Sequence, residues 1–182
     1  MSMKSADIER VRSIAFLKEA NDQTLEAVLN GAFLQRFPAS TTLLMEGDPV
    51  DFLYILLDGA VELGAGWKSK DTTLAILKPV STFILAAAVL EADALMSAVT
   101  LERSEILMVP GESLRRTMKQ DAAFCFSVSE ELAGCYRGLV RSVKNQKLRD
   151  STERLANYLL TLRARQDGND TVALHHEKRV LA

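Results

Sequence analysis

Few side chains in this sequence have the types and spacing that catalysis or metal binding requires. The two histidines, His175 and His176, are adjacent, and neighbours on a helix point about 100° apart, so they do not converge on one ion. The two cysteines, Cys125 and Cys135, are separated by about 15 Å of helical rise, whereas an iron–sulfur cluster needs about four thiolates. We predict no metal site and no iron–sulfur cluster.

An enzyme is the first alternative to weigh, and the sequence gives it little support. Barrel enzymes such as the cupins place two or three histidines and a carboxylate on their strands, but no histidine precedes residue 175. A nucleophile elbow, a P-loop and a metal-binding helix are all missing from the sequence. We therefore predict a protein that binds rather than catalyses, with no catalytic residue.

Composition and charge narrow the class further. Hydrophobic residues make up 48% of the 182 positions and charged residues 25%, as in ordinary globular proteins. The longest apolar run, Phe83–Leu90, is too short to span a bilayer, and the charged N-terminus is unlike a secretion signal, so we predict a cytoplasmic protein with no membrane partner. A formal charge of −2 gives the whole chain no electrostatic footprint for nucleic acid.

Helical patterns open the chain, and short strands follow from residue 33 onward. One helix is expected from Ile8 to Ala15 and a second around Leu25–Leu29, capped by Asn21 or Asp22. Strands are expected at Thr41–Met45, Phe52–Leu57, Ala60–Leu63, Thr72–Leu77, Ala98–Leu101 and Ile106–Val109.

Two features interrupt the series of strands. Asp58-Gly59 lies between two apolar strands and predicts a hairpin in which both central residues have positive φ. Phe83–Leu90 is continuous and rich in alanine, so we expect a short buried helix there. Trp67, in the loop Gly64–Lys70, is expected to anchor a strand end. Short strands at this spacing are typical of a sandwich or jelly-roll barrel.

The helical period returns after Pro110 and persists. A short helix is expected over Glu112–Lys119, and Asp121 is placed to cap a helix that continues to about Lys147. Along it runs an apolar seam at heptad spacing: Val128, Leu132, Cys135, Leu139 and Val143 (or Ser142). This seam predicts a parallel homodimer; the alternative is that the stripe packs on the barrel. Cys135 could form a disulfide across the dimer axis, or serve as a small buried hydrophobe.

A new unit begins at Asp150. Asp150 and Glu153 have the spacing of a capping box and predict a fresh amphipathic helix. A loop at 166–170, a strand at Thr171–Leu174 and a helical start at His175 are expected to follow. The predicted organisation is a barrel domain over 1–120, a dimerisation helix over 121–149, and an incomplete third domain over 150–182.

Four stretches, in this order, resemble the CRP/FNR superfamily of bacterial transcription regulators. They are Phe37–Asp48, Leu53–Leu63, Asp150–Leu160 and Val172–Ala182. The resemblance implies a mostly β fold with α: a jelly-roll, cyclic-nucleotide-binding-like barrel flanked by helices, then a long dimerisation helix and the start of a winged helix-turn-helix domain. It also implies a homodimer with Asp150 as the hinge. DNA, read by residues missing from the sequence, and RNA polymerase are the implied partners.

The effector pocket departs from the cyclic-nucleotide pattern of that family. Its Phe-Gly-Glu turn reads Phe83-Ile84-Leu85 here, and its Arg-Ser-Ala turn reads Met96-Ser97-Ala98. The ribose carboxylate is thus replaced by Leu85 and the phosphate guanidinium by Met96, so we predict that cyclic AMP and cyclic GMP do not bind.

Other occupants of this pocket stay open. The pocket is predicted to hold a small apolar effector, or haem ligated by Cys125, Cys135 or Met96, or to be filled by its own side chains. The alternative for the whole chain is a cyclic-nucleotide-binding-like regulatory or interaction module with no DNA role.

Overall fold

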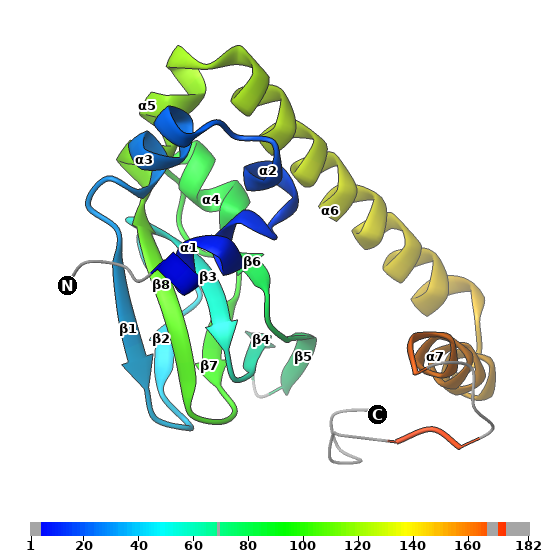
Figure 1. Ribbon diagram of the computed structural model, residues 1–182. Helices are drawn as coiled ribbons and strands as arrows, with labels where there is room; N and C mark the ends of the chain where they lie inside the picture. The colour runs from blue at the N-terminus through cyan, green and yellow to red at the C-terminus, as the bar shows by residue number, and fades with distance from the viewer. Residues whose placement is uncertain (1–4, 69, 167–170, 174–182) are drawn as a thin grey trace. The chain divides into compact units, whose positions relative to one another are not determined.

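The computed structural model describes residues 5–68, 70–166 and 171–173. The chain divides into two compact units, Met1–Leu132 and Ala133–Ala182. Figure 1 shows helices and two layers of strands in the first unit, and helices in the second.

Three short helices open the first unit: α1 (Ser5–Arg12), α2 (Ala15–Lys18) and α3 (Asp22–Leu29). The single helix expected from Ile8 to Ala15 is wrong, because Ile14 adopts an extended conformation (φ −71°, ψ 132°) and separates α1 from α2. The break lets Ile14 bury its side chain. The expected cap of α3 is confirmed, since the Asn21 side chain accepts a hydrogen bond from Thr24 N at 2.8 Å.

Eight strands among the described residues form two antiparallel four-stranded sheets. One sheet has the order β1-β8-β3-β6 and the other β2-β7-β4-β5. Their bounds are β1 Phe33–Phe37, β2 Thr42–Leu44, β3 Phe52–Asp58, β4 Val61–Trp67, β5 Lys70–Leu77, β6 Ser81–Phe83, β7 Ser97–Thr100 and β8 Ser104–Pro110. The predicted jelly-roll barrel with flanking helices is confirmed, although β1 and β6 were not among the expected strands.

The hairpin expected at Asp58-Gly59 is wrong. Strand β3 pairs with β8 and β6, whereas β4 pairs with β5 and β7, so this turn carries the chain from one sheet to the other. Only Gly59 of the pair has a positive φ, of 91°. A Cβ on Gly59 would lie 2.4 Å from Ser104 Oγ and 2.6 Å from the Arg103 carbonyl oxygen, so the crossover requires glycine.

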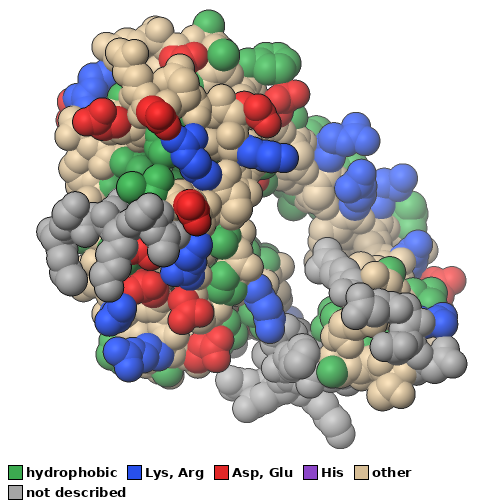
Figure 2. All heavy atoms as spheres, in the orientation of Figure 1, with side chains coloured by type: hydrophobic (Ala, Val, Ile, Leu, Met, Phe, Trp, Pro, Cys, Tyr) green, Lys and Arg blue, Asp and Glu red, His purple; other side chains and the backbone are tan. Residues whose placement is uncertain are grey.

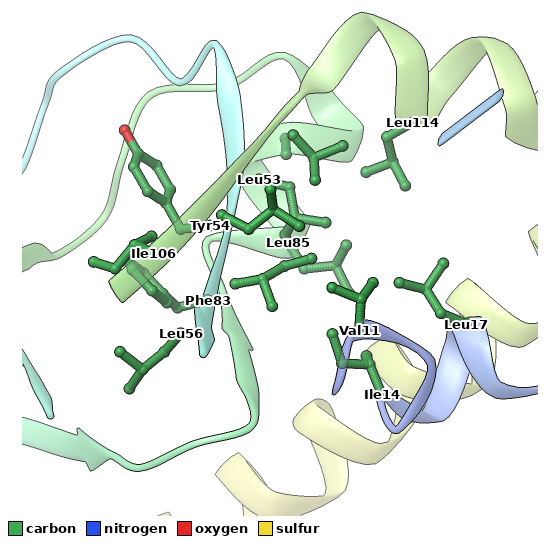
Figure 3. Close-up of a cluster of buried hydrophobic side chains, with 14 of the residues drawn as sticks. Val11, Ile14, Leu17, Leu53, Tyr54, Leu56, Phe83, Leu85, Ile106 and Leu114 are labelled. Carbon is green, nitrogen blue, oxygen red and sulfur yellow. The ribbon is translucent and has the colours of Figure 1, made fainter. Parts of the chain in front are cut away.

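Strand β3 forms the centre of the core. Residues Leu53 to Leu57 are all buried, so both faces of the strand are covered. One face lies inside the sandwich, and helices α1 and α4 (Leu85–Leu90) contact the strand as well. Figure 3 shows Leu53 and Leu56 within one cluster that also receives side chains from α1, α2 and α5.

The hairpin of β4 and β5 extends beyond the expected strands. The register runs from Val61↔Leu77 to Trp67↔Lys70, so the loop expected over Gly64–Lys70 is mostly strand. Trp67 lies at a strand end, as expected, but 77% of it is exposed, so it anchors little. The buried helix expected over Phe83–Leu90 is shorter than predicted, because Phe83 belongs to β6 and α4 begins at Leu85.

Helix α5 (Gly111–Gln120) and helix α6 (Ala122–Leu148) follow the sandwich, as the sequence predicts. The Asp121 carboxylate caps α6 by accepting from Phe124 N at 3.0 Å. Phe124 and Val128 are buried in the core of the first unit. The boundary between the compact units therefore falls inside α6, after Leu132, rather than at the start of the helix.

The second unit contains the rest of α6 and helix α7 (Ser151–Arg165). The capping box is formed as expected: Glu153 N donates to Asp150 Oδ1, and Asp150 N donates to the Glu153 side chain. The strand expected over Thr171–Leu174 is not formed in its described part, residues 171–173. His175, His176 and the helical start expected there lie outside the described residues.

Replacing Gly59 tests the sheet crossover. We expect Gly59→Ala to lower the free energy of unfolding by roughly 3 kcal/mol or more, because strain at positive φ is added to the collision with Ser104. Gly47→Ala is the matched control, since Gly47 has a φ of 89° but no atom within 4 Å of an added Cβ. It should cost about 1–2 kcal/mol. Equal losses for the two variants in urea unfolding would contradict the steric argument.

Candidate effector site

The candidate pocket residues Phe83 and Leu85 are part of the hydrophobic core. Phe83 is 3% exposed and Leu85 is 6% exposed, and both belong to the main hydrophobic cluster. Figure 3 shows the two side chains pointing inward beside Leu53, Leu56 and Ile106. Where a carboxylate would face a ligand hydroxyl, the protein has a buried aliphatic side chain.

Phe83 is held in place by a cross-strand aromatic partner. Phe83 on β6 lies opposite Tyr54 on β3, and their rings stack with centroids 5.1 Å apart and an interplanar angle of 19°. Burial, followed by the negative charges of Asp51 and Asp48, raises the pKa of Tyr54, so the phenol stays neutral at physiological pH.

Ile84 has the backbone conformation of a glycine. Its φ of 64° and ψ of 17° lie in the left-handed region, which is a strained position for a β-branched residue and costs about 1–2 kcal/mol. The turn between β6 and α4 therefore keeps its left-handed shape although the residue in the position of the family's glycine is isoleucine. The Ile84 side chain packs, half-buried, against the core.

The second predicted turn lies on the opposite sheet. Met96 is half-buried against the core, and Ser97 begins β7. The Ser97 hydroxyl donates to the Gly64 carbonyl oxygen at 3.1 Å, on the neighbouring strand β4. Thus Met96 brings no charge to the site, and the hydroxyl of Ser97 already has a partner within the sheet.

None of the five candidate side chains carries a charge, so they cannot neutralise an anion. Among the described residues, no group of three or more His, Cys, Asp or Glu side chains is placed to hold a metal ion. Charges of both signs are interspersed over the visible face of the sandwich unit, where Figure 2 shows red and blue side chains side by side.

Comparison with known proteins is consistent with this architecture. Residues 34–121 match the family described as "Cyclic nucleotide-binding domain". The global nitrogen regulator of Synechocystis sp. is 26% identical over 71% of this chain and 59% of its own length. The cAMP-activated global transcriptional regulator CRP of Pasteurella multocida is 29% identical over 78% of this chain and 68% of its own.

The chain contains a cyclic nucleotide-binding domain, and its homologues include the transcription regulators CRP and global nitrogen regulator. The resemblance that the sequence predicted is confirmed. The crystal structure of DNR from Pseudomonas aeruginosa shares the fold, with a TM-score of 0.66, 17% identity, and coverage of 100% of this chain and 81% of that one. The chain spans 59% and 62% of the length of the two global nitrogen regulators it matches.

Part of the predicted dimer seam along α6 packs on the core of the first unit, and the rest is exposed to solvent. Val128 is fully buried in the domain's own core, so its placement on a seam between subunits is wrong. Leu132 is half-buried against the same core. Cys135, Leu139 and Val143 are exposed, and their place in a dimer stays a prediction.

A different exposed apolar face of α6 was missed. Ala133, Tyr136, Val140 and Val143 are spaced 3, 4 and 3 positions apart, and all are exposed. This heptad spacing was visible in the sequence, but nothing there showed which stripe the barrel would cover. Cys135 points about 100° away from Tyr136 on the helix, which does not favour a disulfide on an axis along this face.

Asp150 lies between the end of α6 at Leu148 and the start of α7 at Ser151, as a hinge residue must. Its role as a hinge stays a prediction, as does the start of a winged helix-turn-helix domain. None of the helices in the described ranges is long and apolar enough to cross a membrane.

Arg115 was also missed by sequence reasoning. It lies on α5 and hydrogen-bonds the end of α4, which is 27 positions away in the chain. A lone arginine in an amphipathic helix gives no sequence signal for such a contact.

Because Ile84 has a left-handed backbone, we predict that the glycine variant is more stable than the alanine variant at this position, the reverse of the order usual in helices. We expect Ile84→Gly to be more stable than Ile84→Ala by about 1 kcal/mol, because only glycine tolerates the left-handed backbone without strain. Ala86, exposed within α4, is the control: Ala86→Gly should cost about 1 kcal/mol, the ordinary helical order. Urea unfolding measures both pairs, and the ordinary order at position 84 would contradict the strain.

Proposed function

We propose that this chain is the sensor and dimerisation region of a CRP/FNR-type DNA-binding transcription regulator that does not respond to cyclic AMP. The observation that carries the proposal is the burial of Phe83 and Leu85 at the turn where the cyclic-nucleotide members present a carboxylate. A phosphate buried without the guanidinium that Met96 replaces costs several kcal/mol, which the remaining apolar contacts do not offset.

The occupant best suited to this pocket is its own set of side chains. Tyr54 stacked on Phe83, with Leu85 and Met96 packed on the core, supports a self-filled site. A small apolar effector remains the second candidate, because the same side chains would contact it without a charge. Haem is less favoured, since Met96 is packed against the core and Cys135 is exposed on α6.

DNA and RNA polymerase are proposed as partners of the complete regulator. The support is the similarity to the nitrogen regulators and to CRP, together with the capped helix α7 that follows α6. Genomic fragments retained by the complete regulator, with and without cyclic AMP, test this part. Retention of the same sites in both conditions supports it, whereas failure to retain DNA favours the interaction module without a DNA role.

Calorimetric titration tests the nucleotide prediction directly. We expect no saturable heat from cyclic AMP or cyclic GMP up to about 1 mM, which limits the binding free energy to weaker than about −4 kcal/mol. The cAMP-activated CRP of Pasteurella multocida serves as the positive control. Micromolar binding of either nucleotide to this chain would show that its phosphate is held by residues other than Leu85 and Met96.

The dimer is proposed to form along the face of Ala133, Tyr136, Val140 and Val143. Tyr136 is 66% exposed, Val140 40% and Val143 41%, and side chains at this heptad spacing are covered well by a parallel copy of the same helix. This register shifts the earlier seam around the helix, because the barrel occupies Val128 and Leu132.

Two charged variants distinguish the registers. We expect Val140→Asp to weaken the dimer at least about tenfold, because an unpaired carboxylate is buried against the partner helix. Cys135→Asp introduces the same charge on the seam first predicted from the sequence, and it should leave the dimer largely intact. Sedimentation equilibrium measures both. If Cys135→Asp dissociates the dimer and Val140→Asp does not, the seam through Cys135 and Leu139 is correct.

A further inference from the structure

Helix α4 cannot be held in place by its own backbone. It has only six residues, and isolated helices of that length are unstable in water. The residues at both of its ends, Ile84 (φ 64°) and Glu91 (φ 53°), lie in the left-handed region that disfavours side chains with a Cβ. Leu85 and Ala88 fix one side of the helix in the core, and at its C-terminal end Ala92 N donates to the Ala87 carbonyl oxygen at 3.1 Å, so a side-chain bond there adds to a backbone cap.

Arg115 supplies that side-chain bond from α5. Its Nη1 donates to the Ala88 carbonyl oxygen at 2.7 Å, and its Nη2 donates to Glu91 Oε1 at 2.8 Å. A guanidinium at a helix C-terminus is favoured by the helix dipole, and its planar fork serves two acceptors at once. The Arg115 side chain is 20% exposed, so its bond to Ala88 is partly shielded from water, whereas the bond to Glu91, whose side chain is 70% exposed, is open to solvent.

Gly111 leaves the room that the guanidinium occupies. A Cβ on Gly111 would lie 2.8 Å from Arg115 Nη1 and 3.5 Å from the Ala88 carbonyl oxygen. Gly111 does not have a positive φ, so its smallness, rather than its backbone freedom, is what this position uses.

Arg115 is also close to the start of the long helix. It lies six positions before Asp121, whose carboxylate caps α6 through Phe124 N. The Thr24 hydroxyl on α3 donates to the other carboxylate oxygen of Asp121 at 2.6 Å. Helix α5 thus connects the end of α4 to the cap of α6, where the Asp121 carboxylate accepts two hydrogen bonds.

We propose that Arg115 is a positioning residue that couples α4, beside the candidate effector pocket, to the start of α6. The proposal rests on the proposed function, because it treats the turn around Ile84 and Leu85 as the sensing site. In this proposal, loss of the bonds from Arg115 to Ala88 and Glu91 loosens α4, and α5, which ends next to Asp121, carries the change to the cap of α6.

Hydrogen exchange followed by mass spectrometry tests the coupling on the full chain, without nucleotide or DNA. We expect Arg115→Met to accelerate exchange about tenfold in peptides over α4 and over the first turns of α6, because charge-assisted bonds are lost. Strands β1 and β8 should keep their rates. Arg116→Met is the matched control, since Arg116 pairs only within α5, with Glu112 at 3.8 Å and with Ser113.

Gly111→Ala provides a second, independent variant that keeps Arg115 but pushes its guanidinium aside. The same two segments should accelerate in it, and this is a pattern that a simple loss of charge does not predict. Acceleration of α4 alone in both variants overturns the coupling and leaves Arg115 as a local cap. Uniform acceleration of the whole sandwich also overturns it. The exchange experiment uses no nucleotide, so its outcome does not depend on whether the titration detects nucleotide binding.

Discussion

The packing of the first turns of α6 into the core of the sandwich unit is the contact on which the other features depend. Phe124 and Val128 are buried, and the ring of Phe124 lies 6.2 Å from that of Phe16 on α2. Truncating such a buried aromatic costs about 3–5 kcal/mol, so α6 does not detach from the domain at little cost. The first compact unit therefore includes the first turns of α6.

The same preference for burial explains the strained turn at Ile84. The left-handed backbone costs about 1–2 kcal/mol, whereas full burial of a large apolar side chain contributes about 1.5–3 kcal/mol. Two such side chains, Phe83 and Leu85, flank Ile84, so their burial outweighs the strain. The turn keeps its shape, and the space that a ligand's polar groups would need is lined by hydrocarbon.

The two apolar stripes of α6 have different surroundings. One stripe, through Phe124, Val128 and Leu132, packs on the sandwich. The other, through Tyr136 and Val140, is exposed over the later turns of the helix. In the proposed dimer the apolar face of α6 changes along the length of the helix, because a stripe that packs on the sandwich is not also free to contact a second copy.

The sequence by itself determined the features that depend on neighbouring residues. The caps at Asn21, Asp121 and Asp150 each join groups three positions apart. The helix from Ala122 follows from helical periodicity that continues over its whole length. Only the tertiary structure decided the crossover at Gly59, the left-handed Ile84, the exposed face at Val140 and the bond from Arg115 to Ala88. Each of these depends on which distant residue packs alongside: Gly59 needs Ser104, and Arg115 reaches across 27 positions. Local spacing carries no information about such partners, since several folds satisfy the same alternation of apolar residues.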